Sequence, residues 1–260
     1  MSIVASTTTR STPGWVQDVE SSKPGLSCTY ALATLSLDQS RPEIRNVGIK
    51  DLISLSPSAR PDRQALLCST DARTPKVLQL VQNPRCSLST WVPEELLQIR
   101  IQAMARTYSS QGWIGGEEAV SGVEVDMKRL RREMWRSESF HGRTRAWHAN
   151  PTPGTDLEGS RDGWTEQLAV STALLEGEDA SPSTGGLGSE EAELKADEVL
   201  ASILENREND SAENRSYKNF ALIVFEPYEV DVVRMAKSGF DRRTRWTKQG
   251  DDWISKEVVP

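Results

Sequence analysis

Apolar and polar residues alternate in a series of short runs along the chain. Such alternation has the period of a β-strand, in which successive side chains point to opposite faces of a sheet. In one run, for example, Ile99 and Ile101 flank Arg100. The predicted strands occupy residues 28–50 (two strands joined by a polar turn near 38–40), 64–69, 86–91, 96–107, 219–225, 228–235, 242–248 and 253–259.

A second spacing, close to 3.6 residues, predicts helices between some of these runs. In the middle helix, Val125, Leu130 and Met134 are expected to line one face. Turns are expected at Pro227 and, as a hairpin, at 249–251. The predicted helices lie within 70–83, 124–138 and 190–206.

This order of elements favours one fold class. Eight or nine short strands with few helices indicate an antiparallel β-barrel rather than a parallel sheet. The sequence contains no G-x-G-x-x-G after a strand, no G-K-[ST] and no H-E-x-x-H. Nucleotide-binding folds of the Rossmann and P-loop types are therefore disfavoured. We expect a mainly β chain with a few peripheral helices.

The composition indicates that the whole chain does not pack into this barrel. Hydrophobic residues make up 37% of the 260 residues, below the usual globular share, so part of the chain is expected to be disordered. Residues 1–13 have the character of a disordered tail. A low-complexity, acidic insertion spans about 175–213. The range 14–260, with this insertion, is expected to form a single domain.

Charge and cysteine usage narrow the class of ligand. The net charge of −7 disfavours nucleic acid as a partner, yet Lys and Arg cluster at 128–145 and 234–248, which suits a small anion. No run approaches the roughly 18 apolar residues of a membrane span. Cys28, Cys68 and Cys86 lack metal-ligand spacing, and two of them fall in strand-like runs typical of core positions. We expect a cytoplasmic location, no membrane contact and no metal.

The stretch STDARTPK, residues 69–76, contains the first candidate anion site. Lys76 lies at the start of a predicted helix, where free backbone N–H groups and the helix dipole favour an anion. Thr74 adds a hydroxyl donor. A capped turn, with Asp71 or Thr74 as N-cap and Pro75 at the first helical position, explains the same residues without a ligand.

Two more candidate groups lie on strands. Arg45 shares a strand face with apolar neighbours, whereas Lys50, five residues later, reaches the same ligand only if a bulge or a strand end intervenes. Gln98 and Arg100 share one face of another strand. Ordinary solvated charges are the alternative for both groups.

A last candidate group lies in the C-terminal hairpin. Arg243 and Arg245 share one strand face, where two like charges repel each other. An anion, or carboxylates such as those of Asp251 and Asp252, would offset this repulsion.

Taken in order, these pieces resemble the pyridoxamine-5'-phosphate oxidase-like family of FMN-binding split barrels. The matching segments are RNVGIK, STDARTPK, NPRCSLSTWVPEELLQIRI, REMWRSESF, NFALIVFEPYEVDVV and DRRTRWTKQGDDWISKEVVP, which together cover roughly 28–148 and 217–260. The chain is most similar to a subset from cyanobacteria, plants and fungi whose activity is mostly undefined. The resemblance implies a Greek-key split β-barrel that forms a homodimer, binds FMN at the subunit interface and performs redox chemistry on a small substrate.

The resemblance also implies a set of cofactor-binding residues. Arg45, Thr74 and Lys76 would hold the FMN phosphate. Ser69 and Thr70 would meet the flavin at a strand end, and Lys50 would lie near the ring. Gln98 would reach the flavin from the neighbouring subunit, and Arg243 would contact it as well.

Departures from the family pattern concern one phosphate contact and the substrate pocket. Pro75 stands where the oxidases have an arginine, and Gln102 replaces a glycine. The substrate-binding and ring-packing residues of the oxidases align with Met134, Glu138, Gly142, Gly239 and Val233. No side chain is identified as a general base, and His141 and His148 lie in predicted loops. We therefore expect an FMN-dependent oxidoreductase acting on an unidentified small molecule. The alternatives are a true oxidase with a rebuilt pocket, a non-catalytic flavin-binding or flavin-sensing protein, and a member that has lost FMN.

Overall fold

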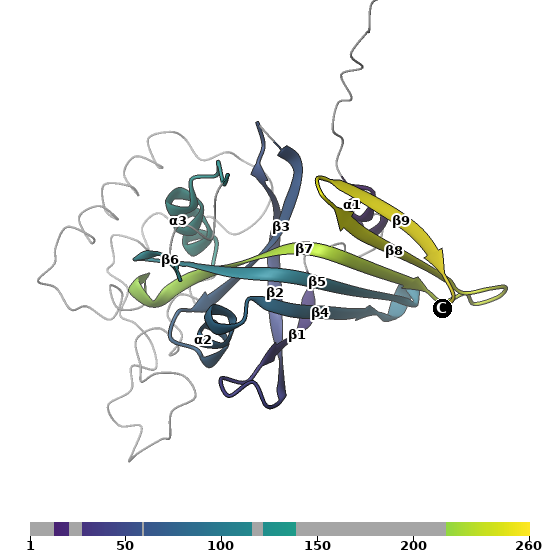
Figure 1. Ribbon diagram of the computed structural model, residues 1–260, viewed down its shortest axis with the longest axis horizontal. Coiled ribbons are helices and arrows are strands. Elements are labelled where there is room, and N and C mark those ends of the chain that lie inside the picture. Colours follow the sequence, from purple (N-terminus) through teal and green to yellow (C-terminus); the bar gives the residue numbers. More distant parts are fainter. Residues whose placement is uncertain (1–12, 21–27, 59, 116–121, 139–216) are drawn as a thin grey trace, which may run out of the picture. The chain divides into compact units, whose positions relative to one another are not determined.

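The computed structural model of the chain describes residues 13–20, 28–58, 60–115, 122–138 and 217–260. Within these residues, nine strands form one antiparallel sheet (Figure 1). The strands are β1 (Thr29–Leu35), β2 (Pro42–Ser56), β3 (Arg60–Asp71), β4 (Arg85–Val92), β5 (Leu97–Ser109), β6 (Gly112–Ile114), β7 (Phe220–Arg234), β8 (Arg242–Gln249) and β9 (Asp252–Val258). The helices are α1 (Gly14–Glu20), α2 (Pro75–Gln82), the 3-10 helix η1 (Pro93–Glu95) and α3 (Met127–Ser137). The predicted mainly β class is confirmed.

Six of the described strands close into a ring. β1 pairs with both β2 and β4, β2 pairs with β3, and β4 pairs with β5. β5 then pairs with β7 along most of its length, and β7 lies next to β3 in the sheet, which completes the ring. β6 extends the sheet beyond β5, and the β8–β9 hairpin extends it beyond β7. This strand order confirms the predicted antiparallel barrel.

The alternating pattern of the strands fills the interior of this ring with apolar side chains. Leu32, Leu88 and Ile99, from three different strands, are fully buried in one hydrophobic cluster. Burial of apolar surface is the main driving force of folding, so these strands are held by their inner faces. Cys68 and Cys86 belong to the same cluster, as their strand-like surroundings predicted.

The predicted turn at Pro227 is wrong. β7 runs through this position without a break, and the expected strands 219–225 and 228–235 form one strand. The pairing of β5 with β7 shifts register between Gln102 and Ala103, opposite Pro227. Proline has no N–H to donate, and a bulge is one of the few places where a sheet tolerates this loss. The hairpin turn at 249–251 is confirmed, with Gly250 at a positive φ of 60°.

Two helices differ from the prediction. The helix α1 was not predicted, and its residues Trp15, Val16 and Val19 are buried in the barrel core. The predicted face of the middle helix is wrong, because the buried residues at helical spacing include Met127 and Arg131 rather than Leu130 and Met134. The boundaries of α2 agree with the prediction.

The described residues fall into two compact units: one contains those up to Met134 together with Ala221–Pro260, and the other contains those between Trp135 and Phe220. The first unit holds the barrel. In the second, Trp135 packs edge-to-face against Tyr217 and Phe220. No helix in the described segments is long and apolar enough to cross a bilayer. The predicted acidic insertion at 175–213 and the helix at 190–206 lie outside the described residues.

Candidate functional site

The start of α2 brings together three of the predicted cofactor-binding residues, Thr70, Thr74 and Lys76. Thr74 is the N-cap residue and Pro75 occupies the first turn, as predicted for a helix start. The Thr74 hydroxyl donates to the backbone carbonyl of Asp71 at 2.8 Å and accepts from Lys76 Nζ at 3.1 Å. Buried Thr70 lies beside it, with 3.4 Å between the two hydroxyl oxygens. The strand end at Asp71 and the helix start therefore form one cluster of donors.

Arg45 lies in a second cluster, on β2, where it contacts two neighbouring elements. Its Nη2 atom donates to Gln79 Oε1 at 2.9 Å and to Glu43 Oε2 at 3.0 Å. Its Nη1 atom donates to the Thr34 hydroxyl and to the backbone carbonyl of Glu43. Gln79, which is only 3% exposed, also donates to Glu43 Oε2 at 2.8 Å. The guanidinium is therefore fixed between β1, β2 and α2.

The two clusters are electrostatically coupled. Burial is the main cause that lowers the pKa of the Lys76 ammonium, and the positive charge of Arg45 lowers it further, against the opposing effects of Cys68 and Asp71. Burial also lowers the pKa of the Arg45 guanidinium, which the charge of Glu43 partly offsets. Two cations that are partly withdrawn from water and repel each other favour an anion between them.

Lys50 and Ser69 are less closely associated with the clusters around Arg45 and Lys76. The pairing of β2 with β3 shifts register between Ile49 and Asp51, so Lys50 lies at a bulge of the kind that the sequence analysis required. Its side chain is exposed. Ser69 lies near the end of β3, and its carbonyl accepts from Cys68 Sγ at 3.2 Å. Neither side chain contacts Arg45 or Lys76 through the hydrogen bonds resolved in the described part of the chain.

Gln98 and Arg243 lie on a different part of the barrel. The register aligns Gln98 on β5 with Val233 on β7, and Val233 with Arg243 on β8. In a neighbouring row of the same face, Asp231 lies beside Arg245. Directly paired residues project to the same side of a sheet, so these side chains form one surface. The residues that alternate with them are in the core, which makes this surface the outer face of the barrel.

The predicted repulsion between Arg243 and Arg245 is resolved by a carboxylate, but not by the predicted ones. Arg243 donates to both oxygens of Asp231, at 2.6–3.0 Å, and Arg245 donates to the same carboxylate at 3.1 Å. Although burial by itself raises the pKa of Asp231, the hydrogen bonds from both arginines outweigh it and hold the pKa below its usual value. Asp251 and Asp252, the carboxylates expected from the sequence, are not these partners, because Asp231 is brought to the arginines by the pairing of β8 with β7.

A polar network farther along β7 was also missed. Glu226 accepts from Arg63 at 2.9 and 3.0 Å, from Lys248 at 3.2 Å and from Arg106 at 3.4 Å. These residues come from β3, β8 and β5, so only the barrel topology brings them together. Sequence alternation places such residues on a face but does not identify their partners.

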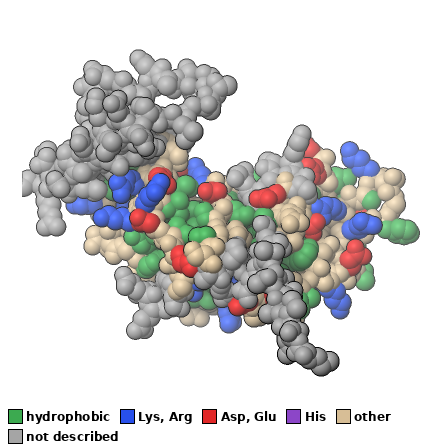
Figure 2. Space-filling model, turned by 90° about the horizontal axis from the view of Figure 1, so that it is seen from above, with side chains coloured by type: hydrophobic (Ala, Val, Ile, Leu, Met, Phe, Trp, Pro, Cys, Tyr) green, Lys and Arg blue, Asp and Glu red, His purple; other side chains and the backbone are tan. Residues whose placement is uncertain are grey.

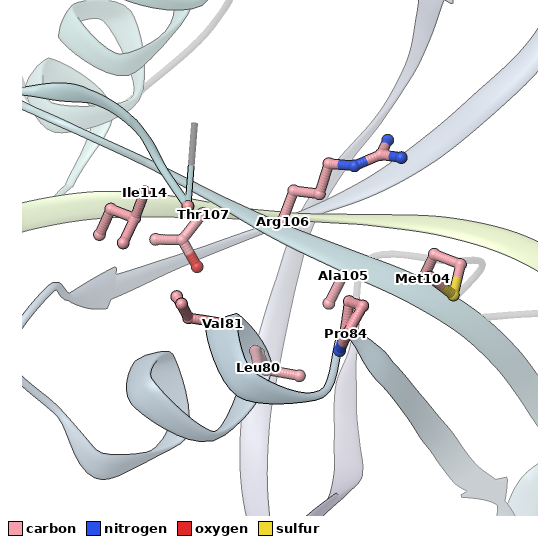
Figure 3. A pocket seen from close by; sticks show the side chains of 9 residues that line it. Leu80, Val81, Pro84, Met104, Ala105, Arg106, Thr107 and Ile114 are labelled. Carbon is pink, nitrogen blue, oxygen red and sulfur yellow. The ribbon is translucent and has the colours of Figure 1, made fainter. Parts of the chain in front are cut away.

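Two cavities of the described barrel unit lie away from these clusters. One, of about 210 Å³, opens at the opposite end of α2 from Lys76. There Thr107 on β5 points toward Val81 on α2, and apolar residues such as Leu80 form the walls (Figure 3). The other, of about 410 Å³, is lined in part by Trp113. None of the eight predicted cofactor-binding residues lines either cavity, so neither is the predicted flavin site.

On the face shown in Figure 2, basic, acidic and hydrophobic side chains are interspersed. Of the positions that depart from the family pattern, Gly142 lies outside the described residues, as do His141 and His148.

Comparison with known proteins agrees with the resemblance inferred from the motifs. Residues 15–109 match the family model of the pyridoxamine 5'-phosphate oxidase FMN-binding domain. A solved structure of a pyridoxamine 5'-phosphate oxidase-related, FMN-binding protein from Nostoc punctiforme has a TM-score of 0.54 and 18% identity, and the similarity covers 89% of this chain and 87% of that one. PhzG from Burkholderia lata, solved with tetrahydrophenazine-1-carboxylic acid, has a TM-score of 0.47 and 18% identity over 95% and 89% of the two chains. A search of curated proteins found no match. The family resemblance and the split-barrel fold are therefore confirmed.

Proposed function

Because residues 15–109 match the FMN-binding domain family of pyridoxamine 5'-phosphate oxidase, we propose that this chain binds FMN and acts as an oxidoreductase on a small molecule. The observation that carries the proposal is the convergence of Arg45 and Lys76, which come from different elements and are electrostatically coupled. The proposed assembly is a homodimer with FMN at the subunit interface.

The donor set at this position fits a phosphate group. A guanidinium and an ammonium can only donate hydrogen bonds, and a threonine hydroxyl can donate one. A phosphate offers acceptors only, so the two sides match. Arg45 and Lys76 are both partly buried, so an anion bound between them would interact with them more strongly than in water. We assign the FMN phosphate to Arg45, Thr74 and Lys76.

The outer face that carries Gln98 and Arg243 is proposed to receive the flavin of the partner subunit. Its residues come from β5 and β8, whereas the phosphate donors come from β2 and from α2 with its N-cap. A flavin that contacted both groups would lie between two copies of the chain. Arg243 would then place positive charge near the ring, where it favours the negative charge that develops on reduction.

When bound, FMN would supply the hydride or electron transfer. The chain's own residues would hold the phosphate, orient the ring and tune its charge. In this arrangement Asp231 would limit the effect of Arg243, since it already binds that guanidinium through three hydrogen bonds. The family positions that grip pyridoxamine phosphate are occupied by other residues, so we propose a different small substrate.

A second candidate function is flavin binding without catalysis, or loss of FMN. Two observations favour it: Glu43 forms an ion pair with Arg45 at 3.0 Å, and Asp231 forms one with Arg243 at 2.6 Å. Both arginines therefore already have a carboxylate partner within the chain. Pro75, in place of a phosphate-binding arginine, removes a further contact.

Purification and titration distinguish these functions. We expect purified protein to be yellow, or to take up added FMN with a change in flavin fluorescence. Reduction of the bound flavin by NADH or NADPH, followed by reoxidation in air, would support the oxidoreductase. A flavin that binds but is reduced by neither nucleotide would support the non-catalytic function. A colourless protein that takes up no FMN would support loss of the cofactor and would contradict both flavin-binding functions.

A further inference from the structure

We propose that Glu43 is an internal competitor at the phosphate site, so that a phosphate-bearing ligand binds Arg45 only by displacing this carboxylate. The inference rests on the proposed function, because it concerns the same site. It adds a residue that controls both the affinity of the site and its selectivity for phosphorylated ligands.

The hydrogen bonds of Arg45 account for all four N–H groups on its terminal nitrogens. Nη1 donates to the Thr34 hydroxyl and to the Glu43 carbonyl, and Nη2 donates to Gln79 Oε1 and Glu43 Oε2. A phosphate that makes a paired contact with these nitrogens must replace at least one of the acceptors. Of the four acceptors, only the Glu43 carboxylate carries a negative charge, so it is the one with which an anion competes directly.

The surroundings of Glu43 allow this exchange. Gln79 and Thr34 are each 3% exposed, which fixes them in place, whereas the Glu43 side chain is 31% exposed and can turn toward solvent. A second cation lies on that side, since Arg41 Nη2 is 3.8 Å from Glu43 Oε1 and its side chain is 75% exposed. Displaced Glu43 would therefore keep a cationic partner while Arg45 accepts the ligand.

Gln79 links the competitor to the helix that carries Lys76. Its amide nitrogen donates to Glu43 and its amide oxygen accepts from Arg45 and Thr34. When Glu43 leaves, this amide nitrogen becomes available as a further donor at the same position. The site would thus gain one donor and lose one negative charge as the phosphate enters.

The test compares two flavins that differ only in the phosphate. FMN and riboflavin share the same ring, and only FMN engages Arg45 through a phosphate. We expect Glu43→Gln to raise the affinity for FMN by about tenfold, the effect of one charge-assisted hydrogen bond, and to leave riboflavin affinity unchanged. Glu94→Gln, at an exposed position in η1, removes the same charge elsewhere and is expected to change neither.

Affinities are measured by titration of flavin fluorescence, and the rise in thermal midpoint on adding FMN provides a second readout of binding. In the background of Arg45→Gln, the effect of Glu43→Gln should disappear. An unchanged or weaker FMN affinity in Glu43→Gln would overturn the inference, because Glu43 would then be neutral or would position Arg45. An equal gain for both flavins would also overturn it. If the native chain and the variant bind neither flavin, the proposed function fails and the competitor role fails with it.

Discussion

Arg45 on β2 and Lys76 on α2 lie close enough for the charge of one to lower the pKa of the other. The pairing of β1 with β2 and the contact of α2 with β1 bring them together. Two partly buried cations beside each other cost stability unless an anion offsets them. Glu43 and Asp71 supply part of that offset within the chain. The part of this cost that the two carboxylates do not offset is the physical basis for a phosphate site.

The first prediction concerns the pH dependence of FMN binding. The pKa of Lys76 lies below its ordinary value of 10.5, so its ammonium loses its proton at a lower pH than an exposed lysine. Only the charged form attracts the phosphate. FMN affinity should therefore fall as the pH rises through this lowered pKa, and Lys76→Ala should flatten that part of the curve. Riboflavin, titrated over the same range, controls for ionisation of the ring.

The second prediction concerns the Glu226 network. This carboxylate accepts from Arg63, Arg106 and Lys248, and its side chain is 15% exposed. Glu226→Gln leaves three partly buried cations without their shared carboxylate. We expect a loss of about 3 kcal/mol in the free energy of unfolding, measured by urea denaturation. Glu94→Gln, which removes a charge at an exposed position, should cost less than about 0.5 kcal/mol.

The Glu226 network should also contribute to the loss of folding stability at acid pH. Burial by itself raises the pKa of Glu226, but Arg63 and Lys248 outweigh it, and the pKa lies below the ordinary value of 4.5. A group whose pKa is lower in the folded state stabilises the fold above its unfolded pKa, and this contribution is lost as the pH falls through the folded value. The native chain should lose stability more steeply below pH 4.5 than Glu226→Gln does. If the native chain and Glu226→Gln lost stability equally as the pH falls below 4.5, this account would be contradicted.

The third prediction concerns the attachment of α1 to the C-terminal hairpin. Trp246 Nε1 donates to Asp18 at 3.2 Å, and the ring of Trp246 lies against Gly14, so that a Cβ at Gly14 would overlap it. Gly14→Ala should therefore lower the free energy of unfolding by about 1–3 kcal/mol. Gly48→Ala is the matched control, because an added Cβ there meets nothing within 4 Å. Equal stabilities for the two variants would contradict this packing.

The strands and their inward faces could be predicted from the sequence because alternation is a local property. Arg45, for example, shares its face with Val47 and Ile49, and both of these are buried. The start of α2 was likewise predictable, since the threonine–proline pair at 74–75 favours a helix N-terminus. These features depend on neighbours in the chain and not on the packing of distant elements.

The partners of the site residues could not be predicted in this way. Gln79 reaches Glu43 from α2, and Asp231 reaches Arg243 from β7, so both contacts depend on which elements become neighbours. Pro227 misled the strand assignment because its position opposite a register shift is a property of the β5–β7 pairing. Sequence reasoning therefore located the cations of the site but not Gln79 and Asp231, which reach two of them from other elements.

The central claim is that Arg45 and Lys76 hold the same phosphate. A double-mutant cycle tests it most directly, with FMN and riboflavin affinities measured for the native chain, Arg45→Ala, Lys76→Ala and the double variant. Each single change should weaken FMN binding by about 1.5–3 kcal/mol, the double variant should lose less or more than their sum because both residues act on one anion, and riboflavin affinity should stay constant. Losses that add to within about 0.5 kcal/mol, or FMN affinity that is the same in all four proteins, would contradict the assignment of both residues to one phosphate.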